Sequence, residues 1–159
     1  METRWPIMNR CGPTVGEAEV AAFEQRLGIP LPDDYRRFLL EVNGGRLAAE
    51  NRRLSHHVIN QLLSLADKDN ESRDLETSAD WARWVLPHPD LLLIGYTDCG
   101  TILLALRGTH RGEMWVQDTV DPRPDDANPR VLWHDRRDMT KLAGSFEEFV
   151  RMLEPLEPI

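Results

Sequence analysis

The sequence is poor in cysteine and has no long apolar run. Its two cysteines, Cys11 and Cys99, are too few for a disulfide framework in a chain of 159 residues. One disulfide bridge could join them, but two free thiols in a reducing cytoplasm are the better interpretation of so few cysteines. No window approaches the roughly 18 continuous apolar residues of a membrane span, and the N-terminus METRWPIMNR lacks the apolar core of a signal peptide. We therefore expect a cytoplasmic protein that does not bind a membrane.

Positive charge is also scarce. The chain has 19 lysines and arginines against 27 acids, which gives a formal net charge of −8. Because nucleic-acid binding needs concentrated positive charge, this balance argues against DNA or RNA as a ligand and favours a basic protein partner. The hydrophobic share of 41% is ordinary for a globular protein, and the length suits one domain with its own core.

Catalytic and metal-binding motifs are missing as well. There is no C-x-x-C, no H-E-x-x-H and no calcium-loop series of carboxylates, and the five histidines have no ligand spacing. A catalytic Cys99 would need a partner that favours its thiolate, and nothing in the spacing specifies one among His88, His110 and His134. A small residue in a tight strand connection explains Cys99 better. We predict no catalytic residue, no metal and no cofactor, and therefore a protein that is not an enzyme.

Two amphipathic helices are predicted between Thr14 and Leu47. Thr14 and Glu17 form a capping box, so the first helix should begin near Val15, and Gly28 should end it. Its apolar face comprises Val20, Phe23 and Leu27.

The second helix should start around Pro32-Asp33-Asp34, because proline tolerates the first turn and the two carboxylates complement the positive end of the helix dipole. The run Asn43-Gly44-Gly45 should stop it, since these residues accept the positive φ of a helix C-terminus. Its apolar stripe comprises Tyr35, Phe38, Leu39 and Val42.

The elements predicted after the second helix are a basic connector, a third helix and five short strands. Residues 46–60 form a locally basic connector, in which His56 and His57 should face solvent. A third helix should begin near Thr77 or Ser78 and end before Pro87. Strands are predicted at 62–65, 91–96, 101–107, 113–118 and 131–134.

A second capping box, Ser145 with Glu148, opens a closing helix that runs to about Leu153. Helices at both ends of the chain with a strand cluster between them predict a single-domain α+β fold: an antiparallel sheet with helices packed on one face.

Three segments together resemble a known family. The run LGIPLPDDYRRFLLEVNGG, from Leu27 to Gly45, is similar to the signature of the SUKH superfamily, in its Smi/Knr-like branch. LLLIGYTDCG and SFEEFVRML are similar to the family's central strand-turn and closing helix. The resemblance implies the same α+β architecture, with an N-terminal lead-in at 1–13, a SUKH-like domain at 14–154 and a C-terminal tail at 155–159.

The resemblance also implies a function. Bacterial SUKH proteins are immunity proteins that neutralise a cognate polymorphic toxin domain, often a nuclease, by direct binding. We therefore expect the partner to be a basic toxin domain, and the protein to be a monomer or a homodimer. Eukaryotic members resemble regulatory scaffold proteins, so a non-toxin interaction module is the alternative, and an enzyme that uses Cys99 is a third.

Charge and aromatic content indicate where such a partner would bind. Residues 67–80 hold six acids and two bases, and residues 121–129 form a loop rich in proline and aspartate. For Trp115 and Trp133, core and interface roles are equally compatible with the sequence, and the acidic run could equally be a solvated face. The predicted partner-binding residues are Asp67, Asp69, Glu71, Asp74, Glu76, Trp115, Asp121, Asp125, Asp126 and Trp133.

Overall fold

Six antiparallel strands form the main sheet of the computed structural model, in the order β3-β4-β5-β6-β7-β8. The structure describes residues 5, 7–9, 13–47, 53–54, 57–66, 74–77, 90–98, 100–118, 132–136 and 138–154. The strands of this sheet are β3 (Arg53–Leu54), β4 (His57–Leu62), β5 (Leu91–Thr97), β6 (Gly100–Ala105), β7 (Met114–Asp118) and β8 (Met139–Ala143). A separate two-stranded ladder pairs β1 (Ile7–Asn9) with β2 (Arg46–Leu47).

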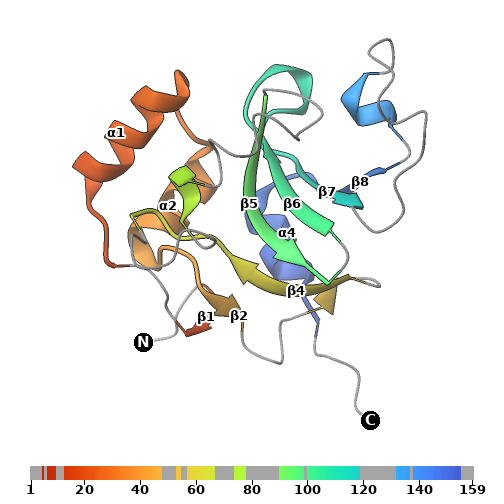
Figure 1. Ribbon diagram of the computed structural model, residues 1–159, viewed down its shortest axis with the longest axis horizontal. Helices are drawn as coiled ribbons and strands as arrows, with labels where there is room; N and C mark the ends of the chain where they lie inside the picture. The colour runs from red at the N-terminus through yellow and green to blue at the C-terminus, as the bar shows by residue number, and fades with distance from the viewer. Residues whose placement is uncertain are drawn as a thin grey trace.

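The helices lie behind this sheet and beside it. In Figure 1, α4 (Phe146–Met152) lies behind the strands, and α1 (Glu17–Leu27) and α2 (Asp33–Glu41) stand at the left. α4 contacts β8 and α2, and α2 contacts α1. The fold is therefore a single α+β domain with an antiparallel sheet, as the sequence predicts.

Aromatic side chains join these helices. The ring of Phe38 in α2 lies 4.9 Å from that of Phe146 in α4, and Trp5 meets both rings, at 5.3 and 5.7 Å. Tyr35 packs edge-on against Phe146 at 5.1 Å. Trp5 is only 2% exposed, so the segment before residue 14 adds a core side chain and the strand β1.

α2 has about the predicted extent, whereas α1 begins at Glu17, two residues after the predicted start, and has a different cap. Gly16, not Thr14, occupies the N-cap, and its amide donates to the carboxylate of Glu19. Gly28 ends the helix at φ 78°, as predicted. Thr14 is exposed and lies outside the helix, and Gly16 has no side chain, so only the half of a capping box that Glu19 supplies is present, two residues further along the chain than predicted.

The turn after α2 also has the predicted backbone. Asn43, Gly44 and Gly45 all have positive φ, at 61°, 79° and 123°. A Cβ on Gly44 would lie 2.3 Å from the carbonyl oxygen of Leu63, so this position excludes any side chain. Close approach of the α2 turn to the chain after β4 therefore requires glycine here.

The strands predicted at 91–96, 101–107 and 113–118 are confirmed, whereas several shorter elements differ from the prediction. β5, β6 and β7 match the predicted strands, and both faces of β5 are buried. The basic connector contains β2, β3 and most of β4, and His57 is 7% exposed instead of facing solvent. The predicted strand at 62–65 is only the end of β4 followed by an isolated bridge at Ser64.

Two corrections concern the C-terminal half. Of the strand predicted at 131–134, residues 132–134 do not form it, because Trp133–Asp135 is a 3-10 helix, η5. The edge strand β8, which follows it, was not predicted. Its sequence MTKLA has neither the alternation nor the apolar density that identifies a strand, so only pairing with β7 defines it.

Candidate interaction site

Four of the ten predicted partner-binding residues lie in the part of the chain that the structure describes. They are Asp74, Glu76, Trp115 and Trp133. The other six lie outside the described residues: Asp67, Asp69, Glu71, Asp121, Asp125 and Asp126.

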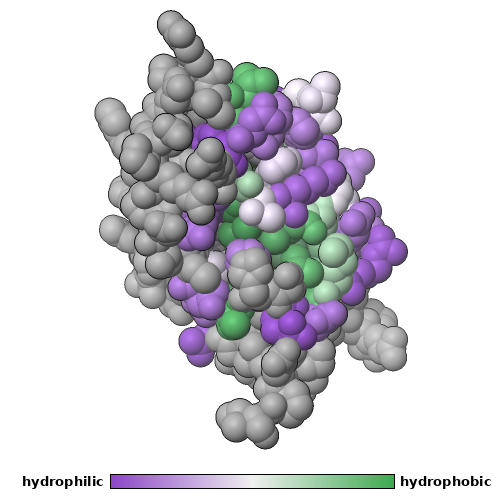
Figure 2. Space-filling view, turned by 90° about the vertical axis from the view of Figure 1, so that its right-hand side faces the viewer, coloured by the Kyte–Doolittle hydropathy of each residue, from purple (hydrophilic) through white to green (hydrophobic). Residues whose placement is uncertain are grey.

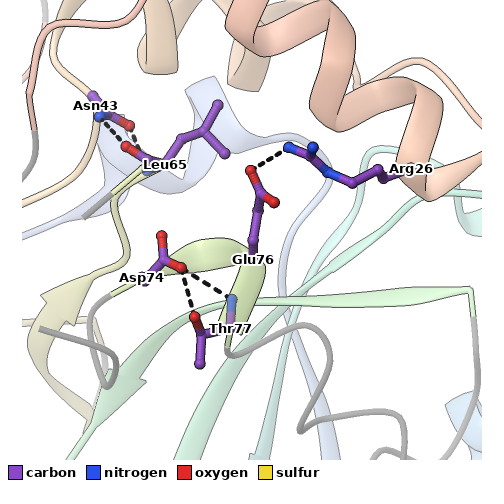
Figure 3. Close-up of polar contacts among 6 residues, drawn as sticks. All are labelled: Arg26, Asn43, Leu65, Asp74, Glu76 and Thr77. Atoms are coloured by element: carbon purple, nitrogen blue, oxygen red, sulfur yellow. Dashed lines mark hydrogen bonds and ion pairs between the residues drawn. The ribbon is translucent and has the colours of Figure 1, made fainter. Parts of the chain in front are cut away.

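Asp74 is a helix cap. Its Oδ2 accepts hydrogen bonds from the backbone N of Thr77 at 3.2 Å and from the Thr77 hydroxyl at 2.7 Å (Figure 3). Residues 75–77 are helical, so this helix begins earlier than the predicted Thr77 or Ser78. Asp74 is 8% exposed, and its carboxylate therefore offers little surface to a partner.

The chain on the two sides of residues 67–73 is held together. Ser64 and Asp74 form a parallel bridge, and the amide of Leu75 donates to the carbonyl oxygen of Ser64 at 2.8 Å. Leu65 is tied in turn to the side chain of Asn43 (Figure 3). The described residues on the two sides of 67–73 therefore meet at one place, beside the end of α2.

Glu76 forms an ion pair with Arg26 of α1 (Figure 3). The two side chains are 33% and 57% exposed, so water and salt screen the pair. Such exposed pairs contribute at most about 1 kcal/mol to folding, so a partner could exchange this contact at low cost. Among the four described candidates, Glu76 is the one that stays within reach of another protein.

Trp115 and Trp133 pack against each other. Their ring centroids are 4.9 Å apart at an interplanar angle of 81°, and the residues are 7% and 8% exposed. Register places Trp115 on the same sheet face as Leu103 of β6 and Lys141 of β8. Both tryptophans therefore belong to the packed interior, which decides between the two roles that the sequence left open.

A polar group at the edge of these rings was not identified from the sequence. Glu113 Oε1 accepts from Trp115 Nε1 at 3.1 Å and lies 2.7 Å from His110 Nδ1, and Glu113 Oε2 lies 3.4 Å from Lys141 Nζ. Partial burial raises the pKa of Glu113, but the hydrogen bonds from His110, Trp115 and Lys141 together outweigh it and hold the pKa below its ordinary value. The spacing His110-x-x-Glu113 is the one sequence signal that could have suggested this contact.

The surface around β8 and η5 faces the viewer in Figure 2. Apolar side chains form a patch in the middle of that view, with hydrophilic side chains around it. Among the described residues, the large apolar side chains with the greatest exposure are Leu132 at 61% and Met152 at 41%. Leu132 directly precedes η5, so this edge of the sheet carries reachable apolar surface beside the two buried tryptophans.

The described side chains form no group that suggests metal or nucleophile chemistry. Within those residues, no three histidines, cysteines or acids gather to hold a metal ion. Cys99 lies outside the described residues, and Asp98 beside it accepts a hydrogen bond from the amide of Val58 at 3.2 Å. None of the helices in the described ranges has the length and apolar character to cross a membrane.

Fold and side chains together define the class: a single-domain α+β protein with a six-stranded antiparallel sheet, an aromatic core between helices and a glycine-rich turn after α2. Residues 14–152 match the SMI1 / KNR4 family (SUKH-1), and the chain belongs to that family. No curated protein matches the sequence.

Proposed function

We propose that this chain is an immunity protein, which binds a cognate toxin domain in the cytoplasm and neutralises it by direct contact. The observation that carries the proposal is the family match, which extends over residues 14–152. The net charge of −8 supports it, because an acidic surface attracts a basic protein and speeds its encounter.

The proposed contacts are acidic side chains. Asp74, Trp115 and Trp133 have intramolecular roles in the fold, so they support the site without offering much surface. Glu76 is partly exposed in the structure. The proposed contact residues are Asp67, Asp69, Glu71 and Glu76 in the acidic run, and Asp121, Asp125 and Asp126 in the proline-rich segment 121–129.

Co-expression is the direct test of the proposal. The partner to use is the C-terminal domain of a polymorphic toxin encoded beside this chain's gene. Cells that make both proteins should survive, cells that make the toxin domain alone should die, and the two proteins should co-purify at a fixed ratio. Death of the doubly expressing cells, or failure to co-purify, would contradict the immunity function.

A charge-reversal variant tests the acidic run separately. Changing Asp67, Asp69 and Glu71 to lysine should weaken toxin binding and reduce its dependence on salt. The matched control changes three acids elsewhere in the sequence to lysine: Glu2, Glu50 and Glu157. Both variants have the same net charge. An equal loss of toxin affinity in both variants would mean that the net charge of the protein, and not the acidic run, determines binding. An unchanged affinity in the Asp67, Asp69 and Glu71 variant would exclude the acidic run as the contact.

A further inference from the structure

The two edges of the six-stranded sheet differ in what lies beside them. At one edge, the backbone N–H of Arg53 in β3 donates to the carbonyl oxygen of Glu154 at 2.9 Å, and the N–H of Glu154 donates back to Arg53 at 2.7 Å. Gly45 exchanges two bonds of the same kind with Leu62 of β4, at 2.9 and 3.0 Å. The chain itself therefore covers this edge. At the other edge lies β8, and β7 is the strand to which it is hydrogen-bonded.

The register of β7 and β8 shows which backbone groups of β8 point away from the sheet. Opposed residues in an antiparallel ladder alternate between pairs that exchange hydrogen bonds and pairs whose N–H and C=O groups turn outward. The N–H of Asp118 donates to the carbonyl oxygen of Asp138 at 2.8 Å, which makes this a pair of the first kind. Lys141 lies opposite Trp115, three steps along the ladder, so this pair is of the second kind.

Lys141 therefore presents its backbone N–H and C=O at the outer edge of β8. Met139, two residues earlier, turns the same way, and its N–H donates to the carbonyl oxygen of Arg136 at 3.1 Å. Neither backbone group of Lys141 has such a partner among the described residues. The side chain of Lys141 is 49% exposed, so water reaches this part of the edge.

The edge is unsuited to pairing with a second copy of the chain. Two copies of β8 related by a two-fold axis at Lys141 would place two lysine side chains directly opposite each other, which is destabilising. The ladder also has a bulge between Lys141 and Ala143. A charged residue and a bulge on an edge strand both oppose association of like edges. A different polypeptide, without a lysine at the matching position, does not meet this repulsion.

Exposed carboxylates lie at both ends of β8. Asp135, in the turn before the strand, has a side chain that is 66% exposed. Glu148 is also exposed, and its carboxylate lies beside Gly144, directly after the last residue of β8. Between these ends, the ammonium of Lys141 is 3.4 Å from the carboxylate of Glu113, which offsets part of its charge. The edge therefore favours an extended segment with basic residues on both sides of its centre.

We propose that β8 is a docking edge, to which the toxin domain adds an antiparallel strand with basic flanking residues, hydrogen-bonded to the N–H and C=O of Lys141. The inference rests on the proposed immunity function and adds a second contact to the acidic side chains named there. The apolar patch in Figure 2 lies on this side of the molecule, and it gives the side chains of an added strand apolar surface to cover.

Amide hydrogen exchange of the whole protein, followed by nuclear magnetic resonance, tests the docking edge. In the free protein the amide of Lys141 should exchange quickly, and that of Thr140, which points to β7, slowly. A saturating amount of the toxin domain, made inactive by mutation, should slow the exchange of the Lys141 amide at least about tenfold. Fast exchange that persists in a complex that forms, or slow exchange of Lys141 in the free protein, would overturn the docking edge alone. Failure of the two proteins to co-purify would overturn the immunity function as well.

Substitution of Lys141 separates its backbone from its side chain. Proline is tolerated on an edge strand where the missing N–H faces outward, so Lys141→Pro should fold and should bind the toxin domain at least about tenfold more weakly in calorimetric titration. Lys141→Ala keeps the amide and removes most of the side chain, so it should lose clearly less affinity. Equal losses in the two variants, or wild-type affinity in Lys141→Pro, would overturn the docking edge. If far-UV circular dichroism shows that Lys141→Pro is unfolded, the exchange of the wild-type Lys141 amide decides alone.

Discussion

Asn43 and Leu65 are hydrogen-bonded to each other in both directions. The Asn43 amide nitrogen donates to the Leu65 carbonyl oxygen at 2.8 Å, and the Leu65 amide donates to Asn43 Oδ1 at 2.7 Å (Figure 3). The same nitrogen also donates to the carbonyl oxygen of Pro13 at 2.7 Å. One buried side chain therefore joins the segment before α1, the end of α2 and the chain that follows β4.

Replacing Asn43 should destabilise the protein strongly. Asn43→Ala leaves the carbonyl of Leu65 and its amide without these partners inside the fold, and the expected loss is about 2–4 kcal/mol of unfolding free energy. Asn43→Asp should cost at least as much, because a carboxylate cannot donate to the two carbonyl oxygens and is buried at 1% exposure. Urea unfolding measures both, and a loss below about 1 kcal/mol in either variant would show that water replaces these bonds.

Gly44 should resist substitution for lack of space and not only for its backbone angle. Gly44→Ala would place a Cβ 2.3 Å from the Leu63 carbonyl oxygen, whereas Gly108 has nearly the same φ, 76° against 79°, and nothing within 4 Å of a built Cβ. Gly108→Ala should cost only the left-handed strain of about 1–2 kcal/mol, and Gly44→Ala clearly more. Equal losses of stability in the two variants, measured by thermal or urea unfolding, would mean that the backbone around Leu63 moves to make room for the added methyl group.

The sequence predicts the elements whose local signals agree with the tertiary contacts. α2 has acids in its first turn and a positive-φ run at its end, and α4 has Ser145 as N-cap, whose hydroxyl accepts from Glu148 N at 3.0 Å. The dense apolar runs of β5 and β6 identify buried strands by composition alone. These elements could therefore be predicted without knowing which distant residues they contact.

The elements that were missed are defined by distant partners. β2 and β3 have two residues each, too few for a period, and exist because they pair with β1 and β4. The candidate site shows the same limit. Asp74 looks like one acid among six, and its burial as a helix cap depends on the bridge to Ser64, ten residues earlier in the chain.

On the proposed immunity function, Phe38 should contribute to protection from the toxin only through folding. It is 1% exposed and contacts Trp5, Tyr35 and Phe146. Phe38→Ala should cost about 3–5 kcal/mol by leaving a cavity in this aromatic core. Under conditions where the variant is still folded, its toxin affinity should equal that of the wild type. Calorimetric titration at low temperature checks this, and weaker binding by a folded variant would place α2 near the contact.

Asp138 should make the protein sensitive to acid. Burial raises its pKa, but bonds from Arg136 at 3.0 Å and from Gln117 at 3.1 Å outweigh this effect, so the pKa is below its ordinary value. The stability from this site is therefore present above the unfolded pKa of about 3.9 and is lost as the pH falls through the folded value.

Asp138→Asn removes that contribution. At pH 7 the variant should be less stable than the wild type by about 1–3 kcal/mol, because Arg136 loses its charged partner. The difference between the two proteins should shrink below about pH 4, where the wild-type carboxylate also takes up a proton. Urea unfolding at a series of pH values measures it, and a difference that does not depend on pH would assign the effect to packing.

Tyr35 is the residue of the α2 apolar stripe whose side chain carries a polar atom, its hydroxyl. Its hydroxyl is buried without a hydrogen-bond partner among them, and burial raises its pKa above the ordinary value. Tyr35→Phe keeps the ring against Phe146 and removes an unpaired polar group, so stability at pH 7 should stay the same or rise by about 1 kcal/mol. Above about pH 10 the unfolded wild-type chain ionises at this position while the folded chain does not, so the wild type should lose stability faster than the variant as the pH rises. A loss of more than about 1 kcal/mol in Tyr35→Phe at pH 7 would mean that the hydroxyl is bonded, to ordered water or to part of the chain beyond the described residues.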